Sequence, residues 1–260
     1  MPRFAANIST LYPEFAQVDR VAAAARDGFA GVEVQSPYGM GATDLQRALR
    51  EVRVELVLMN APQGDMDAGE RGLAALPGRE RDFEASIAEA VEYARAVSAP
   101  RVHVMAGKPA GAQNEAEAVF VRNLKHACDA FAPHGIRVMI EPINTRDMPG
   151  YFLTTPEQAT ALMPRVGAAN LALQFDVYHT QIMVGDVTRR LERYFPQIGH
   201  VQIAGVPERH EPDTGEINYP AIFRALDRLG YAGWVGCEYR PARGNATGGT
   251  SAGLGWMRRC

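Results

Sequence analysis

The feature that most constrains this chain is a regular alternation of short apolar or β-branched runs with longer amphipathic stretches. This pattern predicts parallel strands connected by helices, because parallel neighbours cannot be joined by a tight hairpin. The strand candidates are residues 4–8, 32–35, 55–60, 101–105, 137–141, 171–175, 200–203 and 234–238. The helix candidates are residues 14–26, 44–51, 80–97, 115–132, 156–163, 188–194 and 219–229. Before the fifth of these, Thr155 supplies a cap, followed by Pro156 and Glu157 in the first turn.

Eight predicted strands with helices between them point to one architecture. The chain has 260 residues, which is the usual size of a (β/α)8 barrel, whereas a doubly wound open sheet more often has five or six strands. We therefore predict an α/β fold, a TIM barrel, formed by residues 1–260 as a single domain. No linker rich in Pro, Gly or Ser divides the sequence.

Three irregular segments interrupt the pattern. Residues 62–79 and 144–154 are long insertions after the third and fifth strands, and loops at strand C-termini usually carry function in this fold. The glycine-rich residues 241–260 lack strong periodicity. We expect this tail to pack over the barrel or to lie at an oligomer contact, which leaves a homo-oligomer open.

The charge balance constrains the partners. Lys and Arg number 27 against 30 Asp and Glu, so the net charge is −3. This composition lacks the excess of cations that neutralises phosphates, which argues against nucleic acid or an anionic membrane as the main partner. A small-molecule substrate fits better.

The cysteines indicate a cellular compartment. Cys128, Cys237 and Cys260 are an odd number without CxxC spacing, which argues against a disulfide framework or a structural zinc site. Charged residues also interrupt every hydrophobic stretch before it could span a membrane. We expect a cytoplasmic protein.

Polar residues close four of the apolar runs. Glu141, Asp176 and Glu238 end the fifth, sixth and eighth strands, and Gln202 lies in the seventh. Active sites of this barrel lie at the C-terminal ends of strands, where three carboxylates would repel each other unless a divalent cation neutralised them. An all-oxygen set favours Mg²⁺ or Mn²⁺ over zinc. One such residue alone is commonly a cap or an ion-pair partner, but four on strands of one barrel favour a metal site.

Several cations and histidines are candidates for binding an anionic substrate group through charge-assisted hydrogen bonds. These candidates are expected on loops that follow strands: His179 after the sixth strand, Arg209 and His210 after the seventh, and Lys108 after the fourth. For each of them, a solvated or capping side chain is the alternative. His103, within the fourth strand, is expected to be a buried, hydrogen-bonded barrel residue.

Three common motifs of binding and catalysis are absent. The glycines at 39 and 41 lack the third glycine and the strand-then-helix setting of a dinucleotide fingerprint, and there is no GxxxxGK[ST] phosphate loop. No GxSxG nucleophile elbow occurs either. The sequence therefore does not indicate nucleotide chemistry or covalent acyl transfer.

Long motifs carry a resemblance to a known family. They are EPINTRD at 141–147 with PGYFL at 149–153, FDVYH at 175–179, GHVQIA at 199–204, RHEP at 209–212, GEINY at 215–219 and GCEYRP at 236–241. Together with PRFAAN at 2–7 and AGLGW at 252–256, they closely resemble the hydroxypyruvate isomerase family within the xylose isomerase-like barrels.

The resemblance implies an activity and a site. In this family Glu141, Asp176, Gln202 and Glu238 would ligate one divalent cation, and Glu141 and Glu238 would also move a proton. These are the residues that the strand-end argument selects. The implied reaction interconverts hydroxypyruvate and tartronate semialdehyde through an enediolate, whose charge the cation stabilises. The 2-oxo-tetronate isomerases share much of the pattern and are the alternative.

The loops depart from the commonest family pattern. Gly205 and Glu208 stand where Asp and Gly are expected, Asp213 stands for a Gly, and residues 244–251 are longer and lack an acidic residue. These changes leave the metal set intact and affect the outer contacts to the substrate.

Other functions of the same barrel are the remaining alternatives. A hydride shift is the mechanistic rival, but aldose isomerases that use it hold two metals, and one ligand set is visible here. Sugar 3-epimerases usually carry His where Gln202 stands. Endonucleases for abasic DNA need more His ligands and a basic groove. A noncatalytic binding protein is the last alternative.

Overall fold

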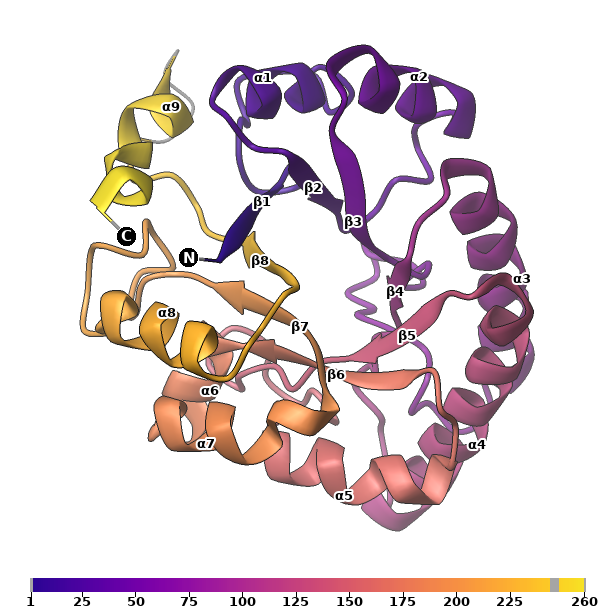
Figure 1. Ribbon diagram of the computed structural model, residues 1–260. Coiled ribbons are helices and arrows are strands. Elements are labelled where there is room, and N and C mark those ends of the chain that lie inside the picture. Colours follow the sequence, from indigo (N-terminus) through magenta and orange to yellow (C-terminus); the bar gives the residue numbers. More distant parts are fainter. Residues whose placement is uncertain (1, 244–247, 260) are drawn as a thin grey trace.

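A computed structural model of the chain describes residues 2–243 and 248–259. The eight strands form one closed, parallel barrel in sequence order, with helices around it (Figure 1), so the predicted TIM barrel is confirmed. The strands are β1 (Arg3–Asn7), β2 (Gly31–Val34), β3 (Glu55–Asn60), β4 (Arg101–His103), β5 (Arg137–Ile140), β6 (Leu171–Asp176), β7 (Ile198–Ile203) and β8 (Trp234–Cys237).

The helices connect the strands and cover the outside of the barrel. They are α1 (Arg20–Arg26), α2 (Ala42–Val52), α3 (Glu80–Val97), α4 (Gln113–Phe131), α5 (Pro156–Val166), α6 (Val177–Met183), α7 (Val187–Tyr194), α8 (Tyr219–Arg228) and α9 (Gly249–Gly253), with 3₁₀ segments η1 (Ala132–His134), η2 (Phe195–Gln197) and η3 (Leu254–Arg259). Each predicted helix is present, although α1 begins at Arg20 rather than at residue 14. Within the described residues, no helix is both long and apolar enough to cross a membrane.

The predicted start of α5 is confirmed in atomic detail. The Thr155 hydroxyl accepts a hydrogen bond from the backbone N–H of Gln158 at 3.1 Å, and Pro156 opens the first turn. This arrangement satisfies one of the backbone donors that the first turn of a helix leaves without a partner.

The apolar core has two parts. A large cluster fills the space between strands and helices, and a small cluster contains Ala5, Val57, Leu58, Met139, Ala172 and Trp234. Because side chains alternate along a strand, the residues two positions after Ala5, Met139 and Ala172 face the same side as these three. Those residues are Asn7, Glu141 and Gln174. The barrel interior therefore changes from apolar to polar toward the C-terminal ends of its strands.

A bulge in β7 sets which of its residues face the interior. Leu173 pairs with Ile198 but Gln174 pairs with His200, so Gly199 is an extra residue in β7. Beyond the bulge, Asp176 of β6 pairs with Gln202. The bulge thus brings Gln202 level with Asp176 at the end of the barrel where the carboxylates gather.

The tail packs against the flank of the barrel between α8 and α1, beside α1 in Figure 1. The Trp256 ring lies 5.0 Å from that of Phe4 and 6.4 Å from that of Phe223 in α8. Thr250 accepts a hydrogen bond from the backbone N–H of Tyr12 at 2.8 Å, and Ser251 donates one to Asp27 at 2.6 Å. Part of the loop departure at 244–251 falls on residues 244–247, which lie outside the described residues.

Candidate active site

A cavity of about 350 Å³ opens at the C-terminal end of the barrel. Both long insertions contribute to its wall, as the sequence led us to expect. The lining residues are Gln35, Asn60, Gln63, Met66, Arg71, His103, Met105, Glu141, Ile143, Asp147, Met148, His179, Arg209, Glu238 and Arg240. The lining thus includes both predicted catalytic glutamates and two of the predicted substrate-binding residues.

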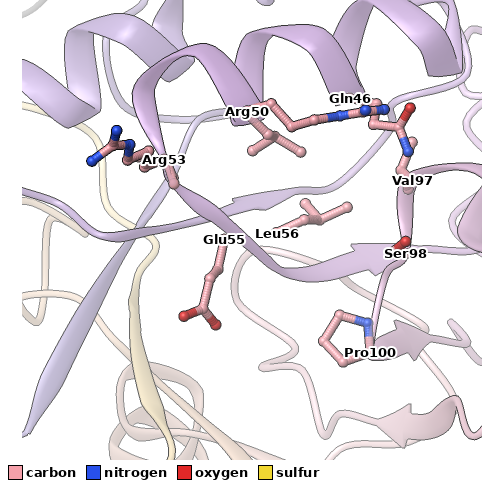
Figure 2. Close-up of a pocket in the computed structure, with 10 residues that line it drawn as sticks. Gln46, Arg50, Arg53, Glu55, Leu56, Val97, Ser98 and Pro100 are labelled. Carbon is pink, nitrogen blue, oxygen red and sulfur yellow. The ribbon is translucent and has the colours of Figure 1, made fainter.

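A second hollow, of about 750 Å³, lies at the opposite end of the barrel (Figure 2). Its wall includes Glu55, the first residue of β3, and Pro100, just before β4, together with Arg50 and Arg53 at the end of α2. Since active sites of this barrel lie at the C-terminal strand ends, we place the chemistry in the smaller cavity.

Glu141 follows β5 directly and is buried. Its Oε2 accepts a hydrogen bond from Gln174 Nε2 at 3.0 Å and lies 3.5 Å from His103 Nδ1. Its Oε1 has no hydrogen-bond partner among the described residues and lies 3.9 Å from His179 Nε2. One oxygen is therefore anchored to the barrel, and the other lies near His179, a residue of the cavity wall.

Glu238 repeats this arrangement after β8. Its Oε2 accepts hydrogen bonds from Gln202 Nε2 at 2.8 Å and from Asn7 Nδ2 at 3.1 Å. Its Oε1 accepts a hydrogen bond from Arg209, another cavity residue. Both glutamates thus have one oxygen fixed by barrel amides and a second on the cavity side.

Asp176 ends β6 and caps α6. Its Oδ1 accepts the backbone N–H of His179 at 3.0 Å, whereas its Oδ2 has no hydrogen-bond partner in the described part of the chain. The prediction that His179 lies on a loop is wrong, because His179 is inside α6. The sequence conceals this helix, since it is seven residues long and opens with Val and Tyr, which favour strands.

Glu141, Asp176 and His179 offer ligand atoms that all lie within 4.8 Å of one another. The hydrogen bonds nevertheless assign His179 a different role. Its Nδ1 accepts from the backbone N–H of Asn144 at 3.3 Å and lies 2.6 Å from Asn144 Nδ2. A neutral imidazole that accepts at Nδ1 carries its proton on Nε2, so this nitrogen is a donor rather than a ligand. The two carboxylates are therefore the better ligands for a cation.

The donor set fits a divalent cation. The unpartnered oxygens of Glu141 and Asp176 are buried, and a buried acceptor without a partner is costly. Burial, together with the nearby carboxylates of Glu238 and Asp176, raises the pKa of Glu141 well above its usual value. Burial raises the pKa of Asp176, and it raises the pKa of Glu238 to about 7 although Arg209 opposes the shift. A bound cation would supply the positive charge that stabilises these buried carboxylates in their ionised form.

The two site histidines are neutral at ordinary pH. Burial lowers the pKa of His103 to about 3, and the nearby His200 adds to the effect. Burial and the Arg209 guanidinium lower the pKa of His179 well below its usual value. The short approach of His103 to Glu141 is therefore not an ion pair.

Arg209 contacts Glu238 and three further side chains around the site. It donates a hydrogen bond to Glu238, lies 3.6 Å from Asp147 and 3.5 Å from His179 Nε2, and covers the Tyr178 ring at 5.0 Å. Burial lowers the pKa of Arg209, but the carboxylates around it outweigh burial and raise it. The predicted Arg209 is thus a fixed cation in the site.

Lys108 and His210 are not brought to the cavity wall. Lys108 is exposed, and His210 makes a 2.8 Å contact from its Nδ1 to the backbone carbonyl of Arg240. Arg71 and Arg240, which the sequence analysis missed, line the cavity instead. Arg71 belongs to the 62–79 insertion, and no spacing in the sequence marks a loop cation that folds inward.

One departure from the family pattern has a steric reason. A Cβ at Gly205 would lie 2.5 Å from the backbone oxygen of Thr214 and 2.7 Å from that of Glu211. The loop after β7 therefore folds in a way that leaves no room for the Asp expected at this position.

Comparison with known proteins assigns the family. The family model described as xylose isomerase-like TIM barrel matches residues 21–260. The chain belongs to the xylose isomerase-like TIM barrel family.

Several full-length relatives narrow the class of enzyme within this family. The chain is 55% identical to the 2-oxo-tetronate isomerase of Cupriavidus necator over 99% of this chain and 98% of that protein. It is 43% identical to the hydroxypyruvate isomerase of Escherichia coli, over 99% of this chain and 98% of that protein. A solved structure named AP endonuclease, family 2, from Brucella melitensis superposes with a TM-score of 0.96 at 46% identity, covering 100% of this chain and 99% of that one. Because the curated relatives are named isomerases, this chain is an enzyme of the isomerase class.

Proposed function

We propose that this enzyme isomerises a small hydroxylated 2-oxo acid, interconverting hydroxypyruvate and tartronate semialdehyde by proton transfer. The observation that carries the proposal is the pair of buried glutamates, Glu141 and Glu238, each with one oxygen anchored and one on the cavity side. Moving a carbonyl along a carbon chain requires removing a proton from one carbon and returning it to the next. Two carboxylates in one cavity can divide these two steps.

Glu141, Asp176, Gln202 and Glu238 would hold one divalent cation, Mg²⁺ or Mn²⁺. When bound, such a cation stabilises the negative charge of the enediolate. The protein's own part is to keep Glu141 Oε1 and Glu238 Oε1 at the cavity, one taking the proton and the other giving it. His179 would donate its Nε2 proton toward a substrate oxygen.

The charges of the cavity favour an acidic substrate. Its charged wall residues are the carboxylates Glu141, Asp147 and Glu238 and the arginines Arg71, Arg209 and Arg240. With buried Asp176 and a divalent cation included, the site carries one net positive charge, which attracts a monoanion. A neutral sugar would gain nothing from it.

Arg71 is the cation best placed to bind the substrate carboxylate. Its guanidinium donates to the backbone carbonyls of Met66 at 3.0 Å and Glu70 at 2.6 Å, and no described carboxylate forms an ion pair with it. Arg209, in contrast, is already paired with Glu238. Lys108 and His210, the other substrate contacts that the sequence predicts, do not line this cavity.

The four-carbon 2-oxo-tetronate is the second candidate substrate. It is favoured by the higher identity, 55%, to the relative named 2-oxo-tetronate isomerase. The same two glutamates would perform the same proton transfer on either acid.

An assay of chelator-treated enzyme with and without added Mg²⁺ or Mn²⁺ tests the proposal, using hydroxypyruvate and 2-oxo-tetronate side by side. We expect metal-dependent turnover of at least one acid. Preference for the four-carbon acid would replace the first candidate by the second. Turnover of neither acid, or cleavage of abasic DNA instead, would reject the function. We further propose a cytoplasmic enzyme whose partner is a small acid rather than nucleic acid or a membrane.

A further inference from the structure

A buried glutamate that the strand-end argument does not select lies beneath the site. Glu33 is in β2, where it pairs in register with Asn7 of β1, and it is 1% exposed. His200 of β7, which is completely buried, contacts its Oε1 through Nε2. An acidic side chain is almost never buried to this degree unless several groups hydrogen-bond it.

The surroundings of Glu33 supply these hydrogen bonds. Its Oε2 accepts from Gln202 Nε2 at 2.7 Å and from Asn7 Nδ2 at 3.2 Å. The neighbouring strand β8 leaves space for the carboxylate, because a Cβ at Gly236 would lie 1.9 Å from Glu33 Oε1. The Glu33 carboxylate is therefore an acceptor held in one position by side chains of β1 and β7, in space that β8 leaves open.

This acceptor fixes the orientation of the Gln202 amide. Gln202 faces Glu33 Oε2 and Glu238 Oε2, which are both acceptors, so the nitrogen of the amide must point toward them. The amide oxygen consequently turns the other way, where it accepts from Gln174 Nε2 at 2.6 Å. That oxygen is the atom through which Gln202 would bind a cation.

The same acceptor also acts on Glu238. Asn7 and Gln202 each donate to Glu33 Oε2 and to Glu238 Oε2, so both amides bridge the two carboxylates. Removal of Glu33 would leave Glu238 Oε2 as the acceptor that both amide nitrogens still share. The two amides would then be held less firmly, and so would the Glu238 carboxylate that they anchor.

We propose that Glu33 is a positioning residue, which holds the Gln202 amide with its oxygen toward the cation site and, through Asn7, keeps Glu238 oriented. This inference rests on the proposed function, because it assigns Gln202 and Glu238 to that site. The rival explanation is that Glu33 only stabilises the barrel. The two differ in whether the effect of Glu33 depends on Gln202.

The test is a double-mutant cycle on the full chain, with Mn²⁺ affinity measured by titration calorimetry after chelator treatment. Glu33→Met, which removes every acceptor at similar size, should weaken Mn²⁺ binding about 10- to 100-fold, as changes behind metal ligands do. In a Gln202→Met background, the same change should lower affinity clearly less than it does in the wild type, because only the Asn7 amide still links Glu33 to the cation site. Glu33→Gln should stay near wild type, since its amide oxygen still accepts from Gln202.

Glu211→Gln is the matched control. Glu211 is also a buried glutamate, but it accepts hydrogen bonds from the backbone N–H of Ala242 and does not line the cavity. Its replacement should leave Mn²⁺ affinity unchanged. Where Glu33→Met fails to fold, Glu33→Asp is compared with and without Gln202 instead. Asp keeps the negative charge, but its side chain is one methylene shorter, so its carboxylate lies farther from the Gln202 amide.

Equal losses of affinity with and without Gln202, or no loss at all, would overturn the positioning role. So would a wild-type chain that binds no Mn²⁺. Because the readout is affinity, a wild-type chain that binds Mn²⁺ and shows the coupling but isomerises neither acid would reject the proposed function alone.

Discussion

At the scale of single residues, the proposed proton transfer depends on two side chains with the same geometry. Glu141 and Glu238 each leave strand ends of the barrel with Oε2 tied to amides and Oε1 on the cavity side. An amide in place of either carboxyl keeps the shape but cannot take up a proton. Replacing either residue by Gln is therefore expected to lower the reaction rate without disturbing the fold.

Glu141→Gln and Glu238→Gln should each lower kcat by about 10²- to 10⁴-fold, the usual contribution of general acid-base catalysis. Steady-state kinetics with saturating Mn²⁺ measures the effect. Glu211→Gln, at a buried glutamate outside the cavity, should keep kcat near wild type. Nearly full activity in either site variant would end the two-glutamate mechanism.

Arg71→Met should raise KM for the acid substrate about 10- to 100-fold with a smaller change in kcat, because a charge-assisted hydrogen bond is worth about 1.5–3 kcal/mol. Lys108→Met is the matched control, since Lys108 is exposed and outside the cavity wall. The reverse result, an increase in KM for Lys108→Met alone, would move the carboxylate site to Lys108 as the sequence analysis allowed.

The sequence predicts the residues at strand ends better than those behind them. Glu141, Asp176 and Glu238 are visible because a carboxylate that closes an apolar run is unusual. Glu33 and Gln174 are also polar residues within apolar runs, but their partners depend on strand register, which a single sequence does not specify. Arg71 carries no signal at all, because its position follows from the path of a loop.

At the scale of elements, the packing of the tail, residues 241–260, is the part of the fold that the sequence predicts least well. Short segments such as α9 and η3 have too few residues for a clear helical period. Bulges are equally hidden, and the extra Gly199 in β7 decides which face Gln202 takes. The long helices α3 and α4, in contrast, follow directly from their periodicity.

Trp256→Ala should destabilise the fold by about 3–5 kcal/mol, the usual cost of truncating a buried Trp, because its ring packs against those of Phe4 and Phe223. Thermal and denaturant unfolding measure the change. Mn²⁺ affinity of the folded variant should stay within a few-fold of wild type, since Trp256 does not line the cavity. An unchanged melting temperature would show that the tail does not stabilise the barrel in solution.

At the scale of the whole molecule, the barrel concentrates negative charge at one end and holds it away from water. Burial keeps the pKa of Glu238 near 7 and raises those of Glu141 and Asp176, whereas His103 and His179 are already neutral. A cation that binds there below pH 7 must therefore displace protons from carboxyls and none from these histidines.

Mn²⁺ affinity should consequently fall as the pH is lowered from about 7.5 to 5.5, by roughly tenfold per pH unit for each proton displaced. Calorimetric titrations in buffers of different ionisation enthalpy would count the protons released. An affinity that does not change over this range would mean that the carboxyls are already ionised in the metal-free protein.

The central claim, proton transfer by two glutamates, is tested most directly by isomerisation in deuterium oxide. The reaction is run to equilibrium, so that each substrate molecule turns over many times and even slow exchange with solvent accumulates. We predict deuterium from the solvent at the carbon that gains the new hydrogen, and none with the Glu141→Gln or Glu238→Gln enzyme in the same time. Product that retains the substrate hydrogen throughout would contradict the account and indicate a hydride shift.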